Sequence, residues 1–539
     1  MALMKKLLSY LKIKLSEPEL NLVCWVTAFS ALAMVASLAF MFVDPWDDWE
    51  HLHASWLVWS GKVPYKDFFE HHNPLLWFML APVLGLFYGS AKVIYAARIY
   101  MLIISAITWF FIYKICRRFL KEKRIWLFII LFLLTFGHYS FHENAEIRAD
   151  ILMYMFFWSG LYNYFAYLQT RKHENLAWCF TLFVLSFLSL QKILPILFIL
   201  GLSGLYFLQK GKIRWRDICY ALPYPLLILG AFFGYFWYND GLEQYFLLNF
   251  KLNFLVPQYY GLRSYMYGPE ASMMDVLVLN NGYFSVDFQL FTTIACSLAL
   301  LFCVIKPFGD SVYFRLILLL FISELLLRIL TFSPWHQYFI LLNVLSLIII
   351  GYYICQWLPN YRDALILAVF SFMFISGTRI CINNYNHRYM LQREISLRQY
   401  VIDNTAENDT VLNCRDYINL YRPDSDYIWF GISDVGWIYR ENFDVPPFDL
   451  NYHIITKKPK FLCTVPYELL PYTYRFKHLH TFFMDTQFLM NRFDNMNLMK
   501  KMNFSEPNLN AYDFDREILE KYYKHTPYNE LLMLKKQYW

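Results

Sequence analysis

The chain has 539 residues, of which 58% are hydrophobic and only 17% charged, and its mean hydropathy is +0.32. Soluble globular proteins carry more charge and fewer apolar side chains, so this composition excludes an ordinary soluble protein. The formal net charge of +6 comes mostly from short basic loops between apolar runs, and it therefore gives no indication of nucleic-acid binding.

Long apolar runs recur over the first 382 residues. They approach the roughly 17–25 residues that a helix needs to cross a hydrocarbon core about 30 Å thick, and they predict about eleven transmembrane helices. The predicted spans are residues 21–43, 93–113, 125–141, 150–168, 176–190, 193–208, 218–238, 289–305, 313–332, 338–357 and 363–382. The expected fold class is thus a polytopic α-helical membrane protein.

Basic residues in the short loops predict the orientation. The loop 114–124 carries six basic residues and the loop 210–216 carries four, and both fall on the same side as the basic N-terminus. By the positive-inside rule this side is cytoplasmic. The loop 44–92 is then external, and so is the tail 383–539, because the number of spans is odd. We expect a multi-pass membrane protein with a cytoplasmic N-terminus.

The segment 44–74 concentrates ionisable groups directly after the first apolar run. It holds six carboxylates and four histidines, which are Asp44, Asp47, Asp48, Glu50, Asp67, Glu70, His51, His53, His71 and His72. Such groups are costly to hold beside a bilayer and unnecessary for folding, so their density indicates a reaction or ligand site. Helical spacing of apolar residues over 47–60, and a short Pro-containing run at 75–88, predict two amphipathic helices in the membrane interface.

Asp47 and Asp48 are the first catalytic candidates. Two adjacent carboxylates just outside a span can deprotonate a hydroxyl or hold a divalent cation. The structural alternative is a helix N-terminus, where acidic side chains satisfy free backbone N–H groups and the helix dipole. Both roles can hold at once, with one acid capping the helix.

The motif Glu70-His71-His72-Asn73-Pro74 is a candidate substrate contact. One histidine could donate to a phosphate or sugar oxygen, and Asn73-Pro74 fixes a turn. Neighbouring residues of an extended chain point in opposite directions, so a clamp of both histidines on a metal is not expected, and no metal ligand is predicted. The alternative is a plain polar turn.

Charged residues also interrupt the ends of later spans. Arg148 and Asp150 open the fourth span, where they either pair with each other or place a carboxylate opposite Asp47 across one cavity. Lys192 interrupts an apolar hairpin and either neutralises a phosphate or snorkels to the interface. Arg263, in the external loop 239–288, has a planar fork suited to phosphate.

Two further sites lie around the ninth and tenth spans. His336, at their external end, is either a substrate contact or a structural hydrogen bonder. Glu324 and Arg328 are four residues apart within the ninth span and most simply pair with each other.

The tail 383–539 changes character, because polar and turn residues return and no run is long enough to span. A helix over 388–402 and strands over 410–412, 427–431 and 460–465 predict a small external α/β domain with its own core. Cys414 and Cys463 lie in this tail and are either a disulfide or two buried thiols. The other eight cysteines lie in or beside predicted spans, where they behave as small apolar residues.

P-loop, GxGxxG, GxSxG and HExxH motifs are absent from the sequence, so nucleotide-driven transport and serine hydrolysis have no support. Four other motifs occur in order, namely DDWEHLH at 47–53, GKVPYKDFFEHHNPL at 61–75, EIRADILM at 146–153 and HQYF at 336–339. This order resembles the GT-C glycosyltransferases, the polytopic enzymes that include bacterial relatives of dolichyl-phosphate-mannose protein mannosyltransferases and the lipid A aminoarabinose transferase. The resemblance covers residues 44–360 well and the tail only in outline.

The resemblance implies a GT-C transmembrane domain over 1–382 in the bacterial inner membrane, with the active site at the external leaflet. It implies a sugar donor linked to polyprenyl phosphate and an acceptor such as lipid A, envelope glycan or protein, with membrane lipids as surroundings. Asp47 would act on the acceptor, with Asp48 beside it and Asp150 as the acid of the second loop. Family members often carry a lysine near the lipid phosphate where this chain has His72, so Lys192 or Arg263 would share that contact. No cofactor is implied, and a divalent cation is allowed but not required.

Two other classes of function compete with this one. A transporter or flippase for lipid-linked sugars would line its pathway with the same charges, but it should show broken helices in repeated halves. A non-catalytic envelope assembly protein would carry loop acids that are dispensable.

Overall fold

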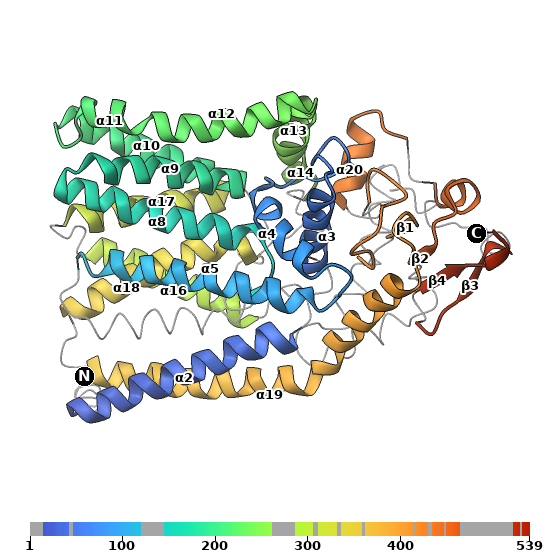
Figure 1. The fold of residues 1–539 in the computed structure, drawn as a ribbon. Coiled ribbons are helices and arrows are strands. Elements are labelled where there is room, and N and C mark those ends of the chain that lie inside the picture. The colour runs from blue at the N-terminus through green and yellow to red at the C-terminus, as the bar shows by residue number, and fades with distance from the viewer. Residues whose placement is uncertain are drawn as a thin grey trace, which may run out of the picture.

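The computed structural model is dominated by long helices that run side by side (Figure 1). It describes residues 15–42, 47–119, 145–260, 286–305, 311–330, 336–357, 362–413, 417–429, 434–446, 449–463, 521–528 and 531–538.

The helices of the bundle follow the apolar runs of the sequence. They are α2 (Glu17–Met41), α5 (Val93–Cys116), α8 (Ala149–Thr170), α9 (His173–Ser189), α10 (Leu194–Gln209), α11 (Trp215–Ala221), α12 (Pro223–Tyr238), α16 (Val286–Ile305), α17 (Val312–Leu330), α18 (Ile340–Trp357) and α19 (Arg362–Asp403). Each predicted span overlaps one of these helices, except that 125–141 lies outside the described residues. Among the described residues, Val93–Cys116, Gln191–Gln209 and Trp215–Tyr238 are long and apolar enough to cross a membrane. The number of eleven spans stays a prediction.

The basic loops gather at one end of the bundle. Arg171 donates from Nη1 to the carbonyl of Lys212, and Arg214 donates from Nη2 to the carbonyl of Arg171 at 3.1 Å. These contacts join the turn between α8 and α9 to the turn between α10 and α11. The acidic loop lies at the opposite end, where Figure 1 shows α3 (Asp47–Trp59) and α4 (Leu75–Leu86). The two ends therefore carry the charge difference on which the predicted orientation depends, and the orientation itself stays a prediction.

Helices α3 and α4 confirm the helical patterns predicted over 47–60 and 75–88. They pack on each other, and the Trp77 indole of α4 donates to His51 Nδ1 of α3 at 3.1 Å. Asp48, Glu50 and His51 lie off the apolar stripe of α3, and they are nevertheless buried. They are buried because α3 lies between α4, α5 and other segments that supply polar partners.

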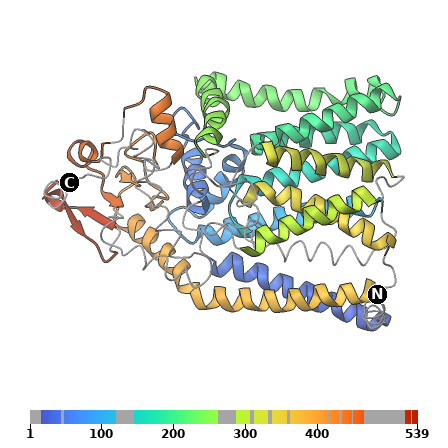
Figure 2. The same ribbon diagram turned by 180° about the vertical axis from the view of Figure 1, so that it is seen from behind.

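Helix α19 runs for 42 residues through the predicted domain boundary at 382/383. It lies beside α2 in both views (Figures 1 and 2), and Asn384 donates to the Ser37 hydroxyl of α2 at 3.2 Å. The helix predicted over 388–402 is the last part of α19. The division into domains stays a prediction.

The tail carries a four-stranded sheet of order β1-β2-β4-β3, at the far end of the molecule from α11 (Figure 1). Its strands are β1 (Val411–Leu412), β2 (Phe461–Cys463), β3 (Tyr523–His525) and β4 (Leu531–Leu534), with β1 and β2 parallel and the other pairs antiparallel. Helices α20 (Asp434–Asn442) and α21 (Leu450–Tyr452) lie between β1 and β2 in sequence. The described part of the tail thus contains both helices and strands, and its forming a separate external domain stays a prediction.

The strand predictions at 410–412 and 460–465 match β1 and β2, whereas the one at 427–431 is wrong over its described residues, 427–429. The Tyr427 carbonyl accepts from the Phe69 amide at 2.9 Å, and the Trp429 indole donates to the Phe69 carbonyl at 3.0 Å. This segment therefore bonds to the first loop instead of the sheet. Cys414 lies outside the described residues, so the disulfide stays untested.

Candidate functional site

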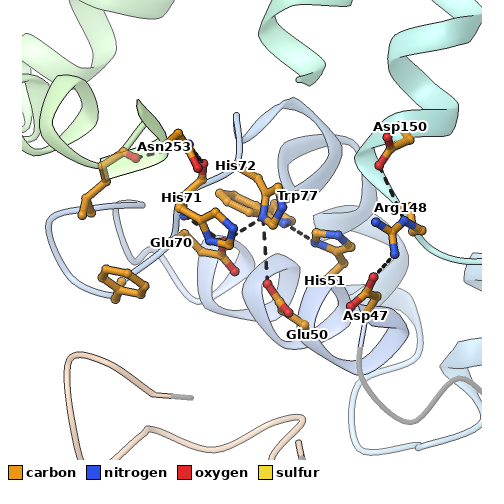
Figure 3. A network of polar contacts seen from close by, with 12 residues as sticks. Asp47, Glu50, His51, Glu70, His71, His72, Trp77, Arg148, Asp150 and Asn253 are labelled. Atoms are coloured by element: carbon orange, nitrogen blue, oxygen red, sulfur yellow. Dashed lines mark hydrogen bonds and ion pairs between the residues drawn. The ribbon is translucent and has the colours of Figure 1, made fainter. Parts of the chain in front are cut away.

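A line of alternating charges crosses the end of the bundle at α3. Arg148 donates from Nη1 to the Asp47 carboxylate, and its Nε lies 3.5 Å from Asp150 Oδ2. Asp150 Oδ1 in turn pairs with Lys192 Nζ. We call Asp47, Arg148, Asp150 and Lys192 the charged line, and Figure 3 shows its first three members. The structure thus brings together residues that the sequence predicted from three separate segments.

Helix ends position the acids of the charged line. Asp47 lies in the first turn of α3, and Asp150 lies in the first turn of α8, just after Arg148. Carboxylates are stabilised at helix N-termini, because free N–H groups and the helix dipole place positive charge there. Lys192 comes from the short helical turn η1 (Gln191–Ile193), which breaks the hairpin between α9 and α10.

The acids at this end differ in access. The side chain of Asp47 is 33% exposed, that of Asp150 is 7% exposed and that of Asp48 is 0% exposed. Of these three carboxylates, Asp47 is the one that an incoming molecule can reach without rearrangement.

Asp48 joins four segments at the centre of this region. Its Oδ2 accepts from Arg98 Nε at 2.8 Å and from Arg98 Nη2, and its Oδ1 accepts from the Ile147 amide at 2.6 Å. Arg98, on α5, also donates to the Phe42 carbonyl at the end of α2, at 2.8 Å. The sequence analysis missed Arg98, although an arginine inside an apolar run is itself a signal of a polar partner.

A second group of residues lies beside the charged line, and we call Glu50, His51, Glu70, His71 and His72 the neutral cluster. His72 Nδ1 lies 3.3 Å from Glu70 Oε2 and 3.9 Å from Glu50 Oε1. The rings of His51 and His72 meet edge to face at 5.5 Å between centroids. Figure 3 shows these side chains pointing toward one another between α3 and α4.

Burial sets the protonation states of the neutral cluster. Loss of solvent raises the pKa of Glu70 to about 8, so this carboxyl is largely protonated at neutral pH. Burial, with a smaller contribution from the Lys192 charge, lowers the pKa of His72 to about 4. Burial also holds the pKa of His51 and His71 well below the usual range. Near pH 7, Glu70 and the three histidines of the cluster are therefore mostly uncharged.

Part of the neutral cluster could hold a metal ion, because Glu70, His71 and His72 offer ligand atoms that all lie within 4.8 Å of one another. The premise that the two adjacent histidines point in opposite directions is wrong here, because the chain bends at His72 and brings their rings to 4.0 Å between centroids. Neutral imidazole is the form that binds metals, so these residues could hold a divalent cation. That no metal is bound stays a prediction.

Hydrogen bonds fix this loop against the rest of the site. The His71 carbonyl accepts from Gln191 Nε2 at 3.0 Å and from Asn253 Nδ2 at 2.6 Å, where Asn253 begins α14 (Asn253–Tyr260). Asn73 donates to the Phe187 carbonyl at 2.5 Å and accepts from the Tyr245 hydroxyl of α13 (Leu242–Phe246) at 3.1 Å. The turn that carries Lys192 is therefore held next to the neutral cluster.

The remaining candidates are only partly placed. Arg263 lies outside the described residues, and His336 is described only by its backbone, in η3 (His336–Phe339). The predicted pair of Glu324 and Arg328 is confirmed, with Arg328 Nε 2.9 Å from Glu324 Oε1. Tyr338 of η3, which the sequence analysis did not single out as a site residue, lies against Lys192, whose Nζ is 4.7 Å from the ring centroid.

Comparisons with known proteins give only distant structural likeness. No family model matches the chain, and no curated protein matches it. Among solved structures, ArnT from Cupriavidus metallidurans in the apo state is similar, with 12% identity and a TM-score of 0.40. The match covers 82% of this chain and 93% of that one. A likeness at this score decides nothing about activity, so the function is argued from the site.

Proposed function

We propose that the protein is a membrane glycosyltransferase that moves a sugar from a polyprenyl-phosphate donor to an acceptor at the external leaflet. The observation that carries the proposal is the charged line, which sets a reachable carboxylate, Asp47, in one row with the ammonium of Lys192. Glycosyl transfer needs a base at the incoming hydroxyl and positive charge at the departing phosphate. The charged line provides both groups in one place.

In the proposed reaction the acceptor hydroxyl gives its proton to Asp47 while its oxygen bonds to the anomeric carbon. The bond from that carbon to the phosphate oxygen breaks, and the phosphate leaves with the electron pair. Lys192 stabilises the negative charge that develops on the phosphate. A single displacement of this kind inverts the anomeric centre, so a product with retained configuration would contradict it.

The other acids take supporting roles in this proposal. Both oxygens of Asp48 are engaged by Arg98 and Ile147, so we assign it to holding α3 in place rather than to the chemistry. Asp150 orients Lys192 and Arg148, and Arg148 holds the Asp47 carboxylate in position. Glu70, His71 and His72 supply uncharged hydrogen-bond donors for the sugar or phosphate.

A transfer assay in proteoliposomes tests the proposal, with polyprenyl-phosphate sugars as donors and lipid A, glycan and peptide acceptors. The Asp47→Asn variant should lose transfer by about 10²–10⁴-fold, the usual effect of removing a general base. Asp240→Asn is the matched control, because its side chain is 88% exposed and its only described ion pair, with Lys66, spans 3.7 Å. Full transfer by Asp47→Asn would exclude Asp47 as the base.

The rival transporter predicts a different result from the same vesicles. A flippase would move lipid-linked sugar across the bilayer without forming a glycosidic bond. Movement of the donor by wild type without any transfer product would replace the enzyme proposal with the transporter.

A further inference from the structure

Arg328 is a buried cation that the proposed reaction does not yet use. It lies near the end of α17, and its side chain is 9% exposed, against 3% for its partner Glu324. An ion pair four residues apart on one helix would ordinarily be complete in itself. Two observations show that this pair is not isolated.

The first observation is that Arg328 meets Lys192 at a single aromatic ring. The guanidinium carbon of Arg328 lies 5.3 Å from the centroid of Tyr338, and Lys192 Nζ lies 4.7 Å from the same centroid. Both cations are attracted by the ring. They also repel each other, and the two carboxylates beside them, Asp150 and Glu324, are held on separate helices.

The second observation concerns the donors of Arg328. Its guanidinium touches Glu324 through Nε, and no hydrogen bond from its two terminal amino groups is found within the described part of the chain. A guanidinium whose terminal donors are not engaged can still take up an incoming anion. Its planar fork fits two oxygens of one phosphate.

We propose that Arg328 binds the phosphate of the donor together with Lys192, with Tyr338 holding both cations at the correct spacing. This inference rests on the proposed function and deepens it, since it names the second cation that stabilises the leaving phosphate. An anion placed between Arg328 and Lys192 removes their repulsion and fills the unused donors. Glu324 keeps the guanidinium oriented before the donor arrives.

The test is a binding measurement with a long-chain polyprenyl phosphate in nanodiscs, compared with the matching polyprenol. Arg328→Gln should weaken binding of the phosphate by about tenfold or more, as expected for loss of a charge-assisted hydrogen bond. It should leave binding of the alcohol unchanged. Arg328→Lys keeps the charge but loses the fork, so its affinity for the phosphate should fall between those of Arg328→Gln and wild type.

The chain offers a matched control in Arg398. It also pairs with a glutamate four residues earlier, Glu394, at 2.6 Å, and it also lies against an aromatic ring, that of Trp49 at 4.0 Å. Among the described residues no lysine lies against that ring. Arg398→Gln should therefore leave the preference for phosphate over alcohol as it is in wild type.

Glu324→Gln separates phosphate binding from a purely structural pair. If Arg328 binds phosphate, this variant keeps the cation and its affinity for polyprenyl phosphate should be retained or increased. Equal losses in Glu324→Gln and Arg328→Gln, or an unchanged Arg328→Gln, would overturn the inference.

The Lys192→Gln variant distinguishes failure of the Arg328 inference from failure of the proposed function. A loss of phosphate binding in Lys192→Gln alone would leave the proposed function intact and remove Arg328 from it. If wild type itself did not prefer the phosphate to the alcohol, both proposals would fall.

Discussion

The charged line and the neutral cluster lie side by side, yet they handle ionisable groups in opposite ways. In the charged line, carboxylates alternate with cations, and Asp47 keeps a third of its side chain exposed. In the neutral cluster, burial keeps Glu70 protonated and the histidines uncharged near pH 7. Ion pairing preserves charge that can act on a substrate, whereas desolvation removes charge and leaves hydrogen bonds or metal binding.

This difference shows that density of ionisable residues in the sequence does not by itself mark the reacting groups. Both regions draw on the same loop, 44–74, and each contains acids and cationic or potentially cationic partners. Their surroundings decide which acids stay ionised. Variants of residues from the charged line and from the neutral cluster test this difference.

The strongest test compares one acid from each region. Asp47→Asn should reduce transfer by about 10²–10⁴-fold. Glu70→Gln should change transfer by less than about threefold, because glutamine resembles the protonated carboxyl that burial favours. Rates measured at pH 7 with saturating donor check both. Equal losses in the two variants would remove the distinction between the regions.

Asp48→Asn should affect stability more than chemistry. Removing one member of the buried pair with Arg98 leaves a buried charge without its partner, at a cost of roughly 3–5 kcal/mol. A lower melting temperature and lower yield in detergent are expected. The double variant Asp48→Asn/Arg98→Met should recover part of the loss, and a stable Asp48→Asn that is inactive would instead point to a chemical role.

The pH dependence of stability should report Glu70. Its folded-state pKa of about 8 lies above the unfolded value, so the folded state binds more protons between about pH 4.5 and 8. Stability should therefore fall as pH rises through this window. His72 has the opposite sign, because its lowered pKa of about 4 makes stability rise with pH between about 4 and 6.5.

Measurements above pH 6.5 separate the contribution of Glu70 from that of His72, because His72 is mostly uncharged in both the folded and the unfolded state there. Melting temperatures between pH 6.5 and 9 should fall for wild type and fall less for Glu70→Gln. Parallel curves for the two proteins would show that Glu70 is already ionised in the folded state.

Metal removal is expected to have the smallest effect. In the proposed reaction, Lys192 and Arg328 stabilise the phosphate that a metal could otherwise bind. Transfer should therefore persist in a chelator. Loss of transfer in a chelator, with recovery on adding Zn²⁺ or Mn²⁺, would direct attention to Glu70, His71 and His72. Glu70→Gln should then abolish the recovery.

The sequence predicts much of the helical architecture. The period and length of apolar runs predict helices, because a helix in lipid must satisfy its own backbone and cover about 30 Å. The helices α3 and α4 follow from helical spacing in the first loop. The sheet was harder to predict, because β3 and β4 are short and β4 pairs with β2 across many residues of the chain.

The tertiary structure determined the partners and the exposure of each candidate residue. Asp47 and Asp48 are chemically identical neighbours, but successive residues of a helix point about 100° apart, so one faces outward and the other faces Arg98. Adjacent histidines converge at a bend where the sequence predicted divergence. Lys192 meets Tyr338 and Arg328 although it is far from both in the chain. The sequence thus determines which polar groups exist and near which helix end they fall. Packing determines their partners, since exposure and pairing depend on what the other helices bring against them.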